Sequence, residues 1–197
     1  MPLQRNEFLP QDLVTVYTSP SGLTDTRTGY PYQMGGLIVG SYFDLTEQEA
    51  QLYGRSQLHE GRYRFVQIDS AATASNIVQG SIGLMKTLAL GVNVITSYDK
   101  GLNGAIRPVV FLNAPTAAQV AAGCYVFVQE EGDAQVLGNS TIGSGNSVGQ
   151  FVSSTTGGTV NTSSGAGFGL LTIGVATTTP AASTLFRVIL DLPPIQG

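Results

Sequence analysis

Short apolar runs separated by glycine, asparagine and proline dominate the chain after residue 61. Each run has the length and the β-branched or aromatic content typical of a strand, and each is bounded by turn-forming residues. They span residues 62–69, 82–88, 92–98, 107–112, 150–153, 159–161, 170–176 and 184–192. This pattern predicts a mainly β protein, with a compact β-barrel or β-sandwich domain over residues 61–197.

The clearest hairpin is expected near the middle of the chain. Two β-prone runs, 125–129 and 134–137, flank the polar sequence Glu130-Glu131-Gly132-Asp133. Acidic side chains in a hairpin turn are ordinarily solvated, so we expect these to face water. They lack the alternating spacing of an EF-hand loop, and we therefore do not predict a calcium site.

Residues 1–60 differ from the rest of the chain and are predicted to form an extended N-terminal arm with one short helix near 46–53. Apolar groups in residues 1–43 have no sustained period and are interrupted by prolines and glycines. Thr46 and Glu49 match a capping box, and Gly54 is a suitable left-handed stop for the helix.

The arm cannot stabilise its own order. Full burial of the apolar side chains of residues 1–43 contributes roughly 25–50 kcal/mol gross, against roughly 40–80 kcal/mol for ordering their backbone. The arm must therefore lie on another surface, which is either its own domain or a neighbouring subunit. The candidate partner-binding residues are Phe8, Leu9, Leu13, Val16, Tyr17, Tyr30 and Tyr32.

Composition excludes several classes of partner. The net charge is −4 and the basic residues are scattered singly, so we expect no nucleic-acid binding. The first residues lack the layout of a signal peptide, and no apolar stretch approaches the ~20 residues that cross a bilayer, so we expect no membrane contact. Cys124 is the only cysteine, lies in an apolar run, and is expected to be a buried thiol.

Motifs with possible chemistry are explained by composition. The G-x-S-x-G match at 145–149 lies in a Gly/Ser/Thr-rich stretch, whereas a nucleophile elbow joins a strand to a helix. The sole histidine, His59, precedes that serine and is expected to be a surface or cap group. The glycines of 165–169 lack the offset of a dinucleotide loop. We therefore predict no catalytic, cofactor-binding or metal site, no small-molecule substrate, and no enzyme activity.

Four features in a fixed order carry a resemblance over residues 60–194. They are the sequences at 61–66, at 123–129 with 132–134, at 174–176 and at 186–193. In this order they resemble the decoration, or cement, proteins of tailed-bacteriophage capsids. The resemblance implies a compact β domain, homotrimers on the outer face of the virion, and contacts that stabilise capsomers of the major capsid protein. It also implies assembly in the cytoplasm of the host bacterium and no chemistry.

Three other functions remain open at this stage. Gly- and Thr-rich β segments also build phage fibres and receptor-binding or carbohydrate-binding modules. Such modules would favour exposed aromatic residues, but the only aromatic residue of 138–167 is Phe151. A hydrolase that uses carboxylates would need two acids with divergent pKa values in one apolar setting. A bacterial module unrelated to phage would be expected to carry a secretion signal.

Overall fold

Ten strands form one sheet in the computed structural model. The structure describes residues 13–18, 40, 42–53, 58–85, 93–95, 107–138, 147–150, 160–162, 172–176 and 184–190. The strands are β1 (Tyr42–Leu45), β2 (Gly61–Ile68), β3 (Ile82–Met85), β4 (Asn93–Ile95), β5 (Arg107–Phe111), β6 (Tyr125–Leu137), β7 (Ser147–Gln150), β8 (Val160–Thr162), β9 (Thr172–Ala176) and β10 (Leu185–Leu190). The mainly β class predicted from the sequence is confirmed.

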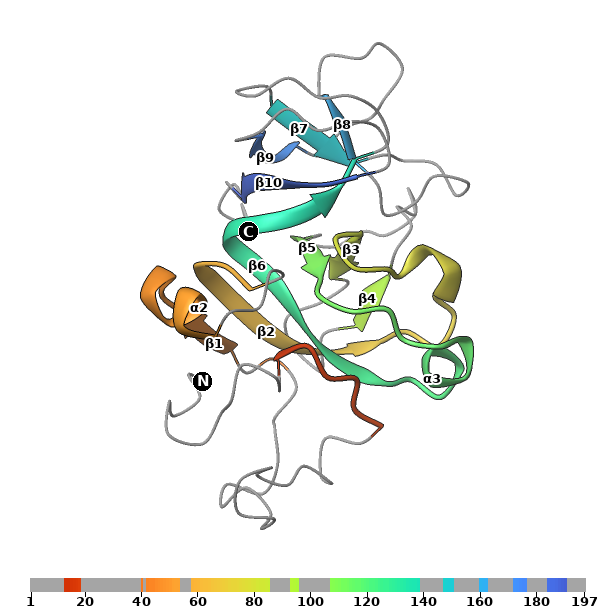
Figure 1. The fold of residues 1–197 in the computed structure, drawn as a ribbon. Coiled ribbons are helices and arrows are strands. Elements are labelled where there is room, and N and C mark those ends of the chain that lie inside the picture. Colours follow the sequence, from red (N-terminus) through yellow and green to blue (C-terminus); the bar gives the residue numbers. More distant parts are fainter. Residues whose placement is uncertain are drawn as a thin grey trace.

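The strand order is β1-β2-β4-β3-β5-β6-β10-β9-β7-β8, and β6 also pairs with β2. Every pairing is antiparallel except that of β2 with β4. Figure 1 shows β6 as the long strand that runs from the part of the molecule built on β2–β5 to the part built on β7–β10. All of the strand runs predicted after residue 61 coincide with or overlap an observed strand.

The hairpin predicted at 125–137 is wrong. Residues Tyr125–Leu137 form one continuous strand of 13 residues, and the acidic stretch lies inside it. Gly132 has φ of 90°, which suits a turn, yet it pairs with Gly61 of β2 and with Leu190 of β10. Partners on both sides hold this stretch extended, because β6 exchanges one neighbour for another at the glycine.

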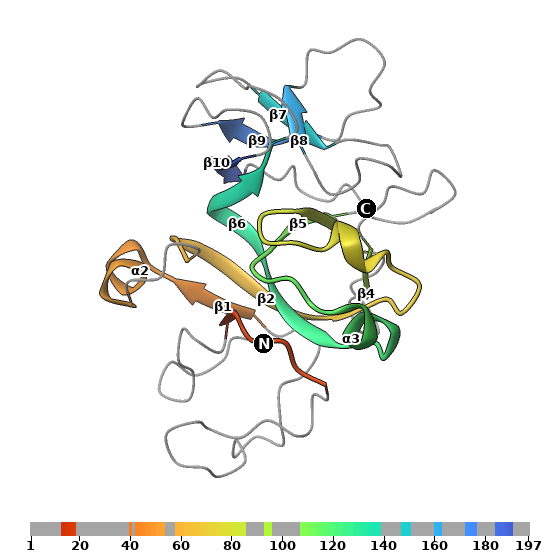
Figure 2. The same cartoon turned by 45° about the vertical axis from the view of Figure 1, so that its right-hand side comes forward.

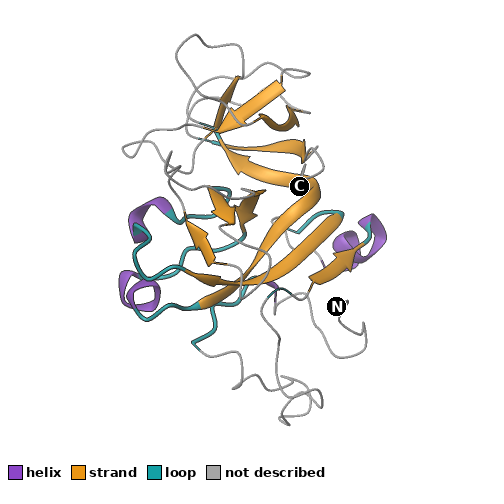
Figure 3. Ribbon diagram, turned by 180° about the vertical axis from the view of Figure 1, so that it is seen from behind, coloured by secondary structure: helices purple, strands orange, loops and turns teal. Residues whose placement is uncertain are grey.

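Two short helices lie at opposite edges of the strands, as Figures 2 and 3 show. Helix α2 (Glu47–Tyr53) confirms the predicted helix. The expected capping box is formed, since Glu49 accepts the backbone N–H of Thr46 at 2.9 Å and the Thr46 hydroxyl accepts that of Glu49 at 3.4 Å. Helix α3 (Ala117–Ala121) and the 3-10 turn η1 (Ala74–Asn76) were not expected.

Helix α3 has a local signal that a pattern of apolar periodicity misses. Its five residues are too few for a repeat, but Thr116 and Gln119 form a second capping box. The Thr116 backbone N–H donates to Gln119 Oε1 at 2.8 Å, and the Gln119 N–H donates to Thr116 Oγ1 at 3.3 Å. A search for the S/T-x-x-E/Q pattern alone would have found it.

Three clusters of buried apolar side chains lie against the sheet. The first, called the aromatic cluster for its four buried aromatic rings, combines residues of β1, β2, β6 and α2 with Leu13, Leu58 and Leu112. The second is mostly β-branched and lies against the other face of β2 and β6, beside α3 and η1. The third joins β3 and β5 to the second half of β6 and to β10. Strand β6 contributes residues to all three clusters and therefore connects them to one another.

The N-terminal segment is part of this core where it is described. Leu13 is fully buried in the first cluster, and Tyr17 packs against the same cluster. Strand β1 pairs with β2 over all four of its residues, so 42–45 belong to the sheet as well. The division at residue 60 between an arm and a β domain stays a prediction.

Candidate functional site

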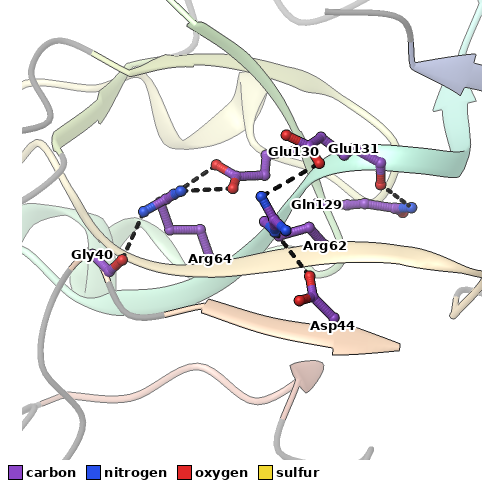
Figure 4. A network of polar contacts seen from close by, with 7 residues as sticks. All are labelled: Gly40, Asp44, Arg62, Arg64, Gln129, Glu130 and Glu131. Carbon is purple, nitrogen blue, oxygen red and sulfur yellow. Dashed lines mark hydrogen bonds and ion pairs between the residues drawn. The ribbon is translucent and has the colours of Figure 1, made fainter. Parts of the chain in front are cut away.

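The candidate site is a row of arginine and acid side chains across β1, β2 and β6. Arg62 of β2 donates from Nε to Asp44 Oδ1 at 2.8 Å, and its Nη1 lies 3.5 Å from Glu131 Oε2. The strand register places Asp44 on one side of Arg62 and Glu131 on the other (Figure 4). The hydrogen bond that Arg62 donates to Asp44 raises the pKa of Arg62, against the opposing effect of burial.

A second pair, two residues further along β2, is largely shielded from water. Arg64 donates from Nε to Glu130 Oε2 at 2.6 Å and from Nη2 to Oε1 at 2.7 Å. Its remaining nitrogen, Nη1, donates to the carbonyl of Gly40 at 2.7 Å. The Glu130 side chain is 0% exposed and that of Arg64 is 15% exposed. Such a bidentate, water-shielded pair fixes both side chains in one arrangement.

A β-bulge creates the room for this pair. Arg62 lies opposite Glu131, whereas Tyr63 lies opposite Gln129, so Glu130 is the extra residue of β6 at this point. A bulge bends its strand and redirects the side chain of the extra residue. The bulge therefore explains how an acid within a paired strand reaches an arginine of the neighbouring strand.

The amide of Gln129 stabilises the bulge from inside. This side chain is 0% exposed, and its Nε2 donates to the carbonyls of Asp133 at 2.8 Å, Glu131 at 3.2 Å and Glu60 at 3.4 Å. Figure 4 shows the bond to Glu131 beside the two arginines. The amide thus donates to backbone carbonyls on both sides of the bulge, those of Glu131 and Asp133 in β6 and that of Glu60 beside β2.

Two further contacts extend the charged row. The ring of Tyr42 on β1 lies under both arginines, with Cζ of Arg62 at 4.6 Å and Cζ of Arg64 at 5.8 Å from its centroid. Further along β6, beyond the bulge, Asp133 forms an ion pair with Arg187 of β10. The three arginines whose side chains the structure describes are thus all used in pairs between neighbouring strands.

An open pocket of about 350 Å³ adjoins the row. Its lining consists of Asp44, Leu45, Thr46, Glu60, Gly61, Arg62, Glu131 and Gly132. The walls carry three carboxylates and one guanidinium, which suits a cationic group better than an anion. Within the described residues, no three histidine, cysteine or acidic side chains come together in a way that could hold a metal ion.

The arm residues predicted to bind a partner divide into two groups. Leu13 is fully buried, and Val16 and Tyr17 are partly buried, all against the chain's own core. Of the two surfaces that the sequence left open for the arm, its own domain is therefore the one contacted here. Phe8, Leu9, Tyr30 and Tyr32 lie outside the described residues.

Three other residues considered as candidates for chemistry, His59, Cys124 and Ser147, lie in positions typical of structural residues. The backbone N–H of His59 donates to the Tyr63 hydroxyl at 3.0 Å, and that hydroxyl donates to the His59 carbonyl at 2.5 Å. Cys124 is buried, as expected, and burial raises the pKa of its thiol. Ser147 begins strand β7, so the serine of the G-x-S-x-G match lies at the start of a strand.

Neither the protein-family models nor the curated proteins include a match to this chain. No helix in the part of the chain that the structure describes is long and apolar enough to span a membrane.

Proposed function

We propose that this chain is a structural protein of a tailed-phage virion, which binds the outer surface of the capsid and stabilises contacts between capsomers of the major capsid protein. The resemblance over residues 60–194 supplies the class. The observation that carries the proposal is the use of charge in the described body, where Arg62, Arg64 and Arg187 pair with acids on adjacent strands. Charge used in this way supports a load-resisting scaffold.

A scaffold of this kind must keep its conformation when neighbouring subunits exert force on it. The bidentate Arg64–Glu130 pair joins β2 to β6, and the Arg64 bond to Gly40 attaches the end of the N-terminal segment to the same point. Each of these bonds crosses between segments far apart in sequence. We propose that this cross-linking, and no catalysis, is what the charged row contributes.

We further infer that β2, β4, β3, β5 and β6 form a small barrel. Successive pairings join β2 to β4, β4 to β3, β3 to β5 and β5 to β6, and β6 pairs again with β2. Closure would remove the free edges of these five strands, which otherwise invite uncontrolled association. The remaining strands β10, β9, β7 and β8 extend from the second half of β6.

The proposed partners are the major capsid protein and further copies of this chain, arranged as a homotrimer on the virion. Phe8, Leu9, Tyr30 and Tyr32 are the proposed capsid-contacting side chains, since Leu13 and Tyr17 are used within the chain. This division of the arm predicts that Tyr30, Tyr32 and residues 1–12 act in binding, whereas residues 13–18 act in folding.

The first test is the copy number of this protein in particles purified from its source, measured by quantitative mass spectrometry against the major capsid protein. A ratio near one supports a cement role. A handful of copies per particle would instead indicate a fibre or tail component. Complete absence from particles would overturn the virion assignment.

Two deletions separate binding from folding. Removal of residues 1–12 leaves Leu13–Thr18 in place, so we expect a folded protein with weaker binding to particles that lack it. Removal of residues 1–39 also takes Leu13 out of the core and should lower stability as well. Unchanged particle occupancy after the shorter deletion would remove residues 1–12 from the interface.

A further inference from the structure

The segment 13–18 joins the sheet through one isolated β-bridge at Tyr17. Tyr17 and Tyr125 exchange both backbone hydrogen bonds, each at 2.8 Å, in an antiparallel bridge. Tyr125 opens β6 and pairs with Gln67 of β2 on its other side. The segment therefore occupies the edge of β6 that lies opposite β2, which is the position that β-strand addition uses in peptide recognition.

Side chains of this segment fill sites on both faces of the sheet. Leu13 is fully buried in the aromatic cluster, and the Tyr17 ring lies edge-on to Phe65 with centroids 5.8 Å apart. Val16 packs against the other, β-branched cluster. We call the edge of β6 at Tyr125, together with the surrounding aromatic cluster, the arm seat.

The connection after this segment is far longer than the path it covers. Tyr17 contacts the ring of Phe65, and Gly40 donates its backbone N–H to the carbonyl of the same residue at 2.7 Å. The chain thus leaves Phe65 and returns to it. Residues 19–39 can span about 70 Å when extended, against a radius of gyration of about 16 Å for a domain of this length.

We propose that the arm seat also accepts residues 13–18 of a second copy of this chain, so that copies join by exchanging this segment. An exchanged segment makes the same hydrogen bonds and the same buried contacts as its own, so exchange loses no contact. The long connection supplies the reach. This inference concerns contacts between copies and does not depend on the capsid role proposed above.

The lone cysteine of the chain offers a direct test. Continuation of the antiparallel register of the Tyr17–Tyr125 bridge by one residue would place Thr18 opposite Cys124. Directly opposed residues of this kind lie about 4.5–5.5 Å apart at Cα, which is within disulfide range. The variant Thr18→Cys should therefore form a bond to Cys124 wherever the segment is docked. The double variant Thr18→Cys/Cys124→Ala is the matched control and should form none.

The experiment starts with the oligomeric state of the full chain, measured by light scattering from micromolar to millimolar concentration. A monomer throughout overturns the proposal. If oligomers form, Thr18→Cys is oxidised and analysed on a non-reducing gel with peptide mapping. A bond between residues 18 and 124 of different chains supports exchange, whereas a bond within single chains alone overturns it.

Failure of the bond to form in oligomers of Thr18→Cys also overturns the proposal. It would mean that residues 18 and 124 do not lie opposite each other in any docked segment, within one chain or between chains.

Discussion

Arg64 binds both carboxylate oxygens of Glu130, at 2.6 Å and 2.7 Å, across two strands that are 66 residues apart in sequence. The Glu130 carboxylate is shielded from water completely and the arginine nearly so. A buried ion pair does not by itself make a protein stable, because two desolvated charges roughly offset their mutual attraction. Removal of one partner is different, since it leaves the other charge buried and uncompensated.

Replacement of one member of this pair should therefore be costly. We expect Glu130→Gln to lower the free energy of unfolding by about 3–5 kcal/mol, because Arg64 keeps its charge without a counterion. Urea denaturation checks the value. The matched control is Asp44→Asn at the exposed Arg62 pair, where a loss of about 0–1 kcal/mol is expected. Similar losses for both variants would contradict the distinction drawn between the two pairs.

Joint replacement of both members tests the same argument from the other side. The double variant Arg64→Met/Glu130→Leu removes both charges, and we expect it to recover most of the stability that either single change loses. A double-mutant cycle in urea measures the recovery. If the losses of the single variants simply added, the pair would be acting as two independent surface charges.

Gln129 supports the bulge that makes this pair possible. Gln129→Met keeps the length of the side chain but leaves the carbonyls of Asp133 and Glu131 without their donor. A buried acceptor left unpaired costs about 1–3 kcal/mol, so we expect a loss in that range from urea denaturation. Gln67→Met is the comparison, because Gln67 makes one such bond, at 3.2 Å to the Gly123 carbonyl. An equal or larger loss there would argue against a special role for Gln129.

The strands were predictable because their signal is local. Runs such as 62–69 and 107–112 carry β-prone residues between turn formers, and the observed β2 and β5 differ from them by at most one residue at each end. The capping box at Thr46 was equally local. Each of these elements is specified within its own stretch of chain, and no distant contact was needed to find it.

The charged row was not predictable for the opposite reason. The acids of 130–133 resemble a solvated turn when only their neighbours in sequence are considered. What buries Glu130 is Arg64, and what keeps Gly132 inside a strand is its pairing with Gly61 and Leu190. These contacts join residues that are far apart in sequence, so neither the composition nor the local sequence pattern indicates them. A weak signal existed in the pairing of isolated arginines with isolated acids in a chain with so few charges.

Gly132 permits a close approach that no other residue would allow. Its φ is +90°, and a Cβ there would lie 2.4 Å from the Glu60 carbonyl oxygen and 2.6 Å from the Gly61 Cα. Both are backbone atoms and cannot move aside. We expect Gly132→Ala to lower the free energy of unfolding by more than the roughly 1–3 kcal/mol attributable to backbone strain alone. The melting temperature should fall accordingly.

Gly123 is the matched control for that substitution. It has φ of +71°, but the one tight contact of an added Cβ would be with the end of the Gln67 side chain, at 3.1 Å; the Ile68 carbonyl oxygen lies at an ordinary contact distance of 3.8 Å. A flexible side chain can shift, so Gly123→Ala should show the strain cost without the clash. Thermal unfolding of the two variants side by side gives the comparison. If Gly123→Ala were as damaging as Gly132→Ala, the approach of β6 to Gly61 would not be the limiting contact.

Tyr63 should make the protein sensitive to alkaline pH. Its phenol is fully buried against the aromatic cluster, and burial raises its pKa well above the usual value near 10, against the weaker opposing effect of the hydrogen bond with His59. Above that usual value the unfolded chain releases the proton while the folded chain keeps it. Because the unfolded state then binds fewer protons, stability is complete below pH 10 and falls as the pH rises further, by about 1.4 kcal/mol per unit.

The variant Tyr63→Phe isolates this contribution. At neutral pH it should be less stable by about 1–3 kcal/mol, because the backbone groups of His59 lose their partner. Between pH 10 and 11 the deficit should shrink by about 1 kcal/mol, since the variant has no phenol to titrate at this position. The other tyrosines contribute equally to both proteins and cancel in the difference. A deficit that stays constant from pH 8 to 11 would mean that the phenol of Tyr63 titrates alike in the folded and unfolded chains, and that the hydroxyl is not held between the two backbone groups of His59.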